Sequence, residues 1–299
     1  MVVYHSTPFI KVTKPYTHVI LVELQRKPVN AFNEALWTEL GQTFDLISKD
    51  DDVRAAVLAS GLPKFFSAGI DLNDTGIAEC ESSDPARTAF VLREQILKFQ
   101  GAISAMERCR HPVIFAAHGI VYGLGVDIAC ACDARYVASD AMFSIKEVDI
   151  ALAADIGTLA RISKITGNAS IVSELALTAR PFNAKEARAF GFVSRVVSGS
   201  RTEVVQAALE TAQLISQKSP IAITGTKHLL MHARDHSVAE NLAYTALWNA
   251  AAVQTEVSKR CNFFIAFFTR LEQLSQDIKN AIAAFQSKKP AKFRNLPKL

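Results

Sequence analysis

The chain has 299 residues, of which 49% are apolar and 21% are charged, so it can bury a sizeable core and intrinsic disorder is excluded as its general state. Its net charge of +4, from 33 basic and 29 acidic side chains, is too balanced to indicate a nucleic-acid partner, which normally requires a clustered basic face. The five cysteines form no C-x-x-C pair, and no apolar run reaches the roughly 18–20 residues of a membrane-spanning helix, so a disulfide framework, a structural zinc site and a membrane span are not expected.

The first part of the chain is predicted to alternate strands and helices. Alternating β-branched residues predict strands over residues 10–13 and 18–24, and a short apolar run predicts a buried strand over residues 55–60. Apolar residues at helical spacing predict a helix over residues 31–48. Alternation of this kind favours an α/β architecture over a sandwich of two β-sheets.

This pattern continues to about residue 201, beyond which only helices are predicted. In chain order, the expected elements are a helix over 87–106, a strand over 113–118, a helix from Gly125, strands over 134–138 and 142–148, and helices over 159–166 and 170–178. Later amphipathic stretches are 202–217, 220–233, 237–257 and 278–286. We therefore divide the chain into a core, residues 1–201, which would hold the functional site, and a helical region, residues 202–299.

Two glycine-containing turns are the first candidates for a functional site. The first is FFSAGIDL, residues 65–72, and the second is AHGIVYGLGVD, residues 117–127, which leads into a helix. Each turn could direct backbone N–H groups toward one point, and a helix N-terminus adds further unpaired donors. Two such donors on one carbonyl oxygen would form an oxyanion hole. The alternative is two tight turns without a function, which glycine forms easily.

Three carboxylates follow the second turn in order: Asp127, Glu147 and Asp155. Asp155 lies between apolar residues, so we expect its ionised form to be poorly solvated, and a carboxyl group in that situation can donate or accept a proton. The alternative for Asp155 is a helix cap, because Gly-Thr-Leu follows it. Asp133, Asp149 and His118 are interpreted as structural. No HExxH, P-loop or GxSxG motif is present.

Taken together, these motifs resemble the crotonase (enoyl-CoA hydratase/isomerase) superfamily. The resemblance rests on FFSAGIDL, HGIVYGLGVDIACACDARY and FSIKEVDIALAADIGTLARI. It implies an α/β fold with a spiral (superhelix) of repeated ββα turns as its core and a C-terminal α-helical trimerisation region. It also implies a homo-oligomer, a trimer or a dimer of trimers, that binds an acyl-CoA substrate.

Within that superfamily, the three carboxylates resemble those of dienoyl-CoA isomerases. This implies that a proton moves from C2 to C6 of a 3,5-dienoyl-CoA, with Glu147 as the base at C2, Asp155 as the acid at C6 and Asp127 orienting or tuning the pair. Plain hydratases of the family instead place two glutamates, at the positions of Asp127 and Glu147, around a water molecule. The alternatives are an enoyl-CoA hydratase, a delta(3)-delta(2)-enoyl-CoA isomerase, and a non-catalytic binding protein of the same fold.

The resemblance also assigns the residues around the thioester. The oxyanion hole would be formed by the backbone N–H groups of Ile70 and Leu124. The CoA and thioester site would be lined by Ala68, Gly69, Ile70, Asp71, Leu72 and Gly125. Leu124 departs from the glycine that the family often has there, so its N–H is correctly placed only if its φ is negative. No metal and no cofactor are implied, because coenzyme A is part of the substrate.

The C-terminal region holds two further features. Residues from about 256 to 275 have no counterpart in the family pattern, and we interpret them as an insertion or as the translation of an unspliced segment. The chain ends in Pro297-Lys298-Leu299, which resembles the tripeptide that a peroxisomal import receptor binds. We therefore expect a peroxisomal protein, with the mitochondrion as the alternative.

Overall fold

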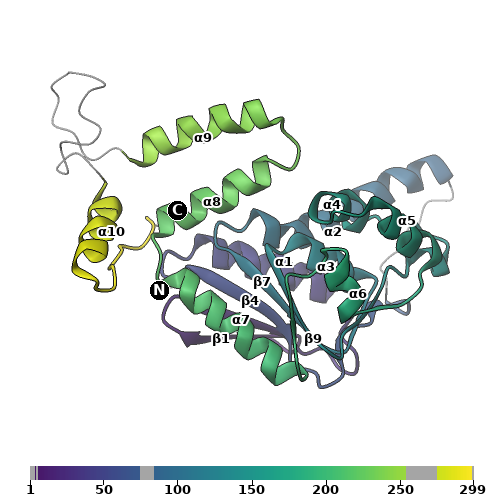
Figure 1. Ribbon diagram of the computed structural model, residues 1–299. Coiled ribbons are helices and arrows are strands. Elements are labelled where there is room, and N and C mark those ends of the chain that lie inside the picture. The colour runs from purple at the N-terminus through teal and green to yellow at the C-terminus, as the bar shows by residue number, and fades with distance from the viewer. Residues whose placement is uncertain (1–3, 5, 75–83, 254–274, 298–299) are drawn as a thin grey trace. The chain divides into compact units, whose positions relative to one another are not determined.

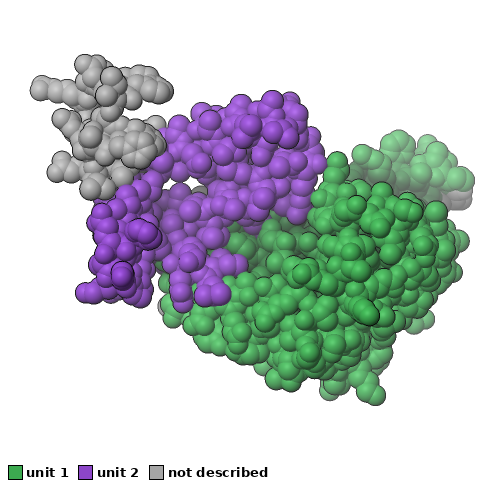
Figure 2. All heavy atoms as spheres, viewed as in Figure 1, with its two compact units in different colours: residues 1–213 green, residues 214–299 purple. Residues whose placement is uncertain are grey.

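The computed structural model of the protein describes residues 4, 6–74, 84–253 and 275–297 (Figure 1). The chain forms two compact units, residues 1–213 and 214–299 (Figure 2). The first unit contains all the sheets of the described chain, and the second consists of helices. Within the described ranges, no helix combines the length and apolar character needed to cross a bilayer.

Three sheets form the first unit. The largest has six strands in the order β1 (Ile10–Tyr16), β2 (Val19–Leu24), β4 (Ala55–Ser60), β7 (Val113–Ala117), β9 (Ala134–Ala138) and β12 (Arg195–Val197). The second has four, in the order β11 (Phe182–Asn183), β10 (Met142–Ser144), β8 (Ile120–Tyr122) and β5 (Phe65–Ser67), and the third pairs β3 (Ala31–Phe32) with β6 (Gly69–Ile70). All strand pairs are parallel except β1–β2 and β10–β11.

Successive turns of the chain each add one strand to the six-stranded sheet, one strand to the four-stranded sheet (the small sheet below) and one helix. The helices of this unit are α1 (Glu34–Lys49), α2 (Pro85–Arg108), α3 (Leu124–Ala131), α4 (Thr158–Ile165), α5 (Ala169–Thr178), α6 (Ala184–Ala189) and most of α7 (Arg201–Ser216). The repeats are β4–β5–α2, β7–β8–α3 and β9–β10–α4. This arrangement is the ββα spiral that the sequence predicts.

Helix α1 illustrates how the sequence determines an element and its first residue. Leu36, Leu40, Phe44 and Ile47 lie on one face of the helix and are all buried. The Asn33 side chain accepts a hydrogen bond from the Leu36 N–H (3.1 Å) and so caps the helix. The helix therefore begins three residues later than the predicted residue 31, because the residues before Asn33 form strand β3.

Aromatic residues fill the core where the small sheet meets the last turn of the spiral. Phe143 on β10 is fully buried, stacks on Phe182 at 5.2 Å between ring centroids and meets the edge of Phe192 at 5.7 Å. Burying rings of this size contributes much of the stability of a domain. The residues after Phe143 lead directly to Glu147, so this packing also fixes the chain near the candidate site.

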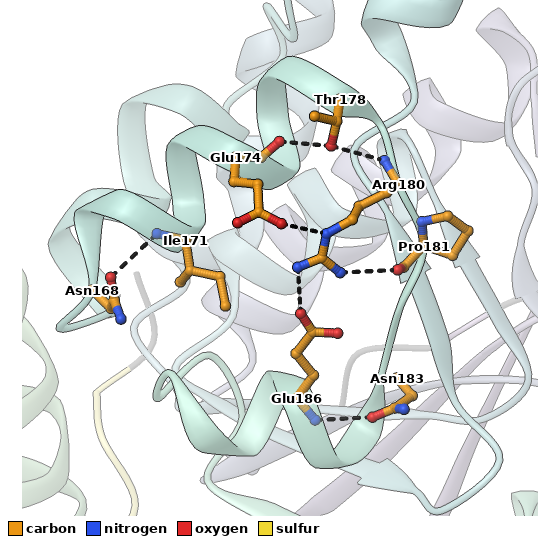
Figure 3. A network of polar contacts seen from close by, with 8 residues as sticks. All are labelled: Asn168, Ile171, Glu174, Thr178, Arg180, Pro181, Asn183 and Glu186. Carbon is orange, nitrogen blue, oxygen red and sulfur yellow. Dashed lines mark hydrogen bonds and ion pairs between the residues drawn. The ribbon is translucent and has the colours of Figure 1, made fainter.

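A polar network holds the corner between α5 and α6 (Figure 3). Arg180 donates one hydrogen bond to Glu174 on α5 and one to Glu186 on α6, each 2.6 Å long. The corner also contains Ala179, whose carbonyl oxygen accepts a hydrogen bond from the buried Ser144 hydroxyl (2.6 Å). The network thereby connects this corner to the end of β10.

The second unit contains α8 (Pro220–His232), α9 (Val238–Ala252) and α10 (Gln276–Ser287). These helices confirm the helical stretches predicted after residue 202, as far as the described residues extend. The atypical segment from about 256 to 275 lies outside the described residues except for Ser275, which caps α10, and so do Cys80, Cys261 and the last two residues. The predicted strand over 142–148 is too long, because Glu147–Ile150 forms a 3-10 helix.

We predict that Phe143→Ala lowers the free energy of unfolding by about 3–5 kcal/mol, because it removes a ring from a filled core. The matched control is Phe90→Ala on α2, where the side chain is 74% exposed and the loss should stay within about 0.5 kcal/mol. Urea denaturation measures both. Equal losses in the two variants would contradict the packing described.

Candidate active site

The two glycine turns of the sequence lie against each other. A Cβ atom added to Gly69 would lie 3.3 Å from the Tyr122 carbonyl oxygen and 3.8 Å from the Gly123 Cα. One added to Gly123 would lie 3.4 Å from Glu147 Oε1. Both glycines also have positive φ angles, 102° and 49°. Glycine is therefore needed at both positions, and Glu147 lies beside the point where the turns meet.

The two predicted N–H donors stand on these turns. Directly after β6 the Asp71 N–H donates to the Phe32 carbonyl of β3 (2.9 Å), and neighbouring N–H groups of an extended segment point to opposite sides. The Ile70 N–H is therefore directed away from β3. Leu124 begins α3 in helical conformation, and the positive φ of its turn belongs to Gly123, so the requirement for a negative φ at Leu124 is met.

A pocket that is partly open to solvent lies beside the two turns. Its lining consists of Ala68, Gly69, Ile70, Leu72, Phe99, Gly123, Leu124, Asp127, Lys146, Glu147, Ile150, Leu152, Asp155 and Ile156. The structure thus brings together both turns and all three predicted carboxylates. The rest of the lining is mostly apolar, which suits a hydrocarbon chain.

Two of the predicted lining residues do not line this pocket. The Asp71 carboxylate forms an ion pair with Arg26 (2.8 Å), and the hydrogen bond from Arg26 lowers the pKa of Asp71. Gly125 is packed beneath the turn, where an added Cβ would lie 3.2 Å from Val121 Cγ1. Their place in the CoA and thioester site stays a prediction.

Asp127 is buried on α3, and its Oδ1 atom accepts two hydrogen bonds from Thr158. The Thr158 N–H donates at 2.6 Å and the Thr158 hydroxyl at 2.8 Å. Burial raises the pKa of Asp127 to about 6, while the two donors act in the opposite direction. The carboxylate can thus be ionised near neutral pH although it is almost inaccessible to water.

Glu147 is half-buried at the start of the 3-10 helix that follows β10. Its Oε2 atom is buried and has no hydrogen-bond partner among the described residues. Burial first, and then the charge of Asp127, raise the pKa of Glu147 to about 7. A carboxylate in this state is a stronger base than an exposed glutamate, and its free oxygen is available to accept a proton.

Asp155 lies on the exposed side of the pocket, and the expectation that it would be poorly solvated is wrong. Its apolar neighbours in sequence do not surround it, because residues 151–153 are themselves exposed. Asp155 is not the cap of α4 either, since Gly157 holds that position. Gln100 on α2 donates to the Asp155 carbonyl oxygen (2.6 Å) and so helps to fix the backbone there.

The residues interpreted as structural do not line this pocket, and each has a partner elsewhere. His118 is buried and its Nε2 atom contacts the Leu62 carbonyl oxygen (2.7 Å), and burial lowers the pKa of His118. Asp133 accepts a hydrogen bond from the Val113 N–H (2.7 Å). Asp149 forms an ion pair with Lys146 (2.8 Å).

Sequence reasoning missed Lys146 and four apolar residues of the lining, Phe99, Ile150, Leu152 and Ile156. Phe99 belongs to the helix over 87–106 that was predicted, but helical periodicity does not tell which buried residue faces a cavity. Ile150 is the last residue of the 3-10 helix and Leu152 follows it, and the predicted strand over 142–148 overlaps the start of that helix. Their exposed apolar side chains, 40% and 51% accessible, were a signal that only the structure makes visible.

Comparison with known proteins places the chain in a family. The family model described as enoyl-CoA hydratase/isomerase matches residues 14–273. A relative from Homo sapiens, "Delta(3,5)-Delta(2,4)-dienoyl-CoA isomerase, mitochondrial", is 47% identical over 255 residues, which cover 84% of this chain and 77% of that protein. A relative from Arabidopsis thaliana, the peroxisomal protein of the same name, is 40% identical over 271 residues, covering 90% and 89%.

Solved structures agree with the fold. DspI from Pseudomonas aeruginosa superposes with a TM-score of 0.79 at 26% identity, covering 97% of this chain and 98% of that one. An enoyl-CoA hydratase from Bacillus anthracis has the same TM-score at 23% identity, covering 95% and 98%, and shows the fold alone. With the ββα spiral and the matched family model, the chain belongs to the enoyl-CoA hydratase/isomerase family.

Proposed function

We propose that the protein is a delta(3,5)-delta(2,4)-dienoyl-CoA isomerase, which converts a 3,5-dienoyl-CoA into a 2,4-dienoyl-CoA. The observation that carries this proposal is the meeting of Asp127, Glu147 and Asp155 in one pocket beside the two glycine turns. The relatives of that name from Homo sapiens and Arabidopsis thaliana, at 47% and 40% identity, support it.

In this proposal the thioester carbonyl oxygen accepts hydrogen bonds from the Ile70 and Leu124 N–H groups. When a proton leaves C2, the electron pair of the broken C–H bond spreads through the dienolate to that oxygen. Donors fixed in advance stabilise this charge without having to reorient, and losing one such donor typically costs about 3 kcal/mol in the transition state. The contacts between the two turns keep the donors in place before substrate arrives.

Two carboxyl groups then move the proton. Glu147 takes the proton from C2, because its pKa is raised and its Oε2 atom is unpaired. Asp155 gives a proton to C6, so that the double bonds shift toward the thioester. After the reaction Glu147 holds an extra proton and Asp155 lacks one. Because Asp155 faces solvent and the pocket is partly open, Glu147 can release its proton to water and Asp155 can take one up, which restores the starting state. No metal and no redox cofactor take part in these steps.

Assembly and location follow from the same proposal. We propose a homo-oligomer, a trimer or a dimer of trimers, built through the C-terminal helices, with an oxyanion hole in each copy. Helix α9 supports this, because Val238, Leu242 and Leu247 are 78%, 64% and 68% exposed within the chain. We propose a role in β-oxidation of unsaturated fatty acids in the peroxisome, through recognition of Pro297-Lys298-Leu299, with the mitochondrion as the alternative.

The direct test is an ultraviolet assay on the purified protein. A 3,5-dienoyl-CoA has no double bond conjugated with the thioester, so its isomerisation creates a new absorbance band. Hydration of a 2-enoyl-CoA removes a band instead. We expect the first change and at most a slow second one, and a protein that only hydrates would contradict the proposal.

We predict that Asp155→Asn lowers kcat for dienoyl-CoA isomerisation by at least about 100-fold, because an amide cannot supply the proton at C6. Binding of the CoA ester should change little, since Asp155 lies on the exposed side of the pocket. Asp45→Asn, an exposed acid on α1 with 55% side-chain exposure, is the matched control. Unchanged turnover in the Asp155 variant would remove this residue from the mechanism.

We also predict how activity depends on pH. Glu147 must be ionised to accept a proton, and its pKa is raised to about 7. On the acid side of about pH 7, kcat/KM should therefore fall tenfold per pH unit. If kcat/KM stayed constant from pH 7 down to pH 5, the base would be an ordinary exposed carboxylate and the prediction would be wrong.

A further inference from the structure

Among the residues that the structure describes, Thr158 is the one that donates hydrogen bonds to the Asp127 carboxylate. Its side chain is fully buried, and both its backbone N–H and its hydroxyl donate to the same oxygen, Asp127 Oδ1. The distances are 2.6 and 2.8 Å. Because Thr158 is the first residue of α4, its N–H is one of the donors that no carbonyl within the helix can pair.

The beginning of α4 is held in place by one face of α2. Arg161 donates through Nε and Nη2 to Glu107 Oε2, at 3.0 and 2.7 Å, and through Nη2 to Ser104 (2.8 Å). Gln100 reaches the Asp155 carbonyl oxygen. Residues 100, 104 and 107 are four and three positions apart, so they lie on the same side of α2. This polar stripe anchors the segment that carries both Asp155 and Thr158.

Gly157 makes that anchoring possible. A Cβ atom at Gly157 would lie 1.9 Å from the Arg161 Nη1 atom, so any other residue would push the guanidinium away. The position of Thr158 is therefore fixed from both sides, by the hydrogen bonds to Asp127 and by the Arg161 contacts with α2. A donor held this rigidly can favour one charge state of its acceptor.

We propose that Thr158 is a positioning residue that keeps Asp127 ionised and, through the charge on Asp127, sets the proton affinity of Glu147. This inference rests on the proposed function, because it concerns the base of that reaction. A hydrogen bond to an ionised acceptor stabilises the ionised form, and here the acceptor is cut off from water. Without the hydroxyl, one N–H alone would have to stabilise the buried carboxylate.

The other charged groups near the pair are accounted for. Asp127 is influenced by Asp155, which disfavours its charge, and by Arg161, which favours it but is already paired with Glu107. Glu147 is influenced by the charges of Asp127 and Asp155. The cation that lines the pocket on the Glu147 side, Lys146, is paired with Asp149. The hydroxyl of Thr158 is therefore a donor to Asp127 whose removal changes no net charge.

The test compares three variants of the full-length protein by the pH dependence of kcat/KM with a 3,5-dienoyl-CoA. Thr158→Val keeps the shape and the backbone N–H but removes the hydroxyl, so Asp127 becomes harder to ionise and its charge opposes the ionisation of Glu147 less. We expect its acid limb to move to lower pH, by up to about one unit, while the maximal value of kcat/KM is largely kept. Thr158→Ser keeps a hydroxyl and should restore the wild-type profile.

The matched control is Thr166→Val at the other end of α4, where the hydroxyl bonds only to the Ile162 carbonyl (2.9 Å) and its loss should not move the limb. A lower rate at every pH with an unmoved limb in Thr158→Val would overturn the proposal and leave Thr158 a structural residue. A wild-type protein without isomerase activity would instead overturn the proposed function, so the two failures are distinguishable.

A further variant, Asp127→Asn, tests the proposal if circular dichroism shows that Thr158→Val does not fold. Asp127→Asn removes the charge that Thr158 is proposed to maintain. The acid limb of its residual activity should then move to lower pH than in the wild type, because no neighbouring charge opposes the ionisation of Glu147. A limb that stays at the wild-type pH would overturn the proposal.

Discussion

The site depends on how closely two stretches of backbone approach each other. Gly69 and Gly123 both have positive φ angles, and a Cβ atom added to either would contact the other turn, at 3.3 Å from Tyr122 and 3.7 Å from Gly69 respectively. The Gly123 N–H also donates a hydrogen bond to the Ser144 carbonyl oxygen (2.9 Å). The Ser144 hydroxyl in turn donates to the carbonyl oxygen of Ala179, which lies at the corner held by Arg180. The two proposed oxyanion donors are thereby connected to the packed core, which holds them ready before substrate binds.

The three carboxylates differ because their surroundings differ. Asp127 is buried and bonded twice by Thr158, Glu147 is half-buried with one free oxygen, and Asp155 faces solvent. Burying two acids near each other is unfavourable, and their raised pKa values are the direct expression of that cost. Different surroundings can thus give three carboxyl groups three roles, and the proposed ones are a fixed charge for Asp127, the base for Glu147 and the acid for Asp155.

Much of this could be predicted from the sequence, because strong periodicity and glycine spacing are local signals. The strands Ala55–Ser60 and Ala134–Ala138 were predicted to the residue, and the order of turns and carboxylates led to one pocket. The two-residue strands β3 and β6 were not predicted, since so short a run has no period. The solvation of Asp155 was predicted wrongly, because apolar neighbours in sequence surround a residue only if the chain folds over it.

The contacts of Asp127 bear on why the reaction would be a proton shift rather than an addition of water. A hydratase of this fold needs two glutamates that both reach a water molecule, whereas position 127 carries the shorter aspartate. One of its oxygens is already occupied by two donors from Thr158, which hold it against the start of α4. In the proposed mechanism Asp127 would then contribute charge to Glu147 instead of a second contact to water. The Oε2 atom of Glu147 has no hydrogen-bond partner among the described residues, which suits its proposed role as the base at C2.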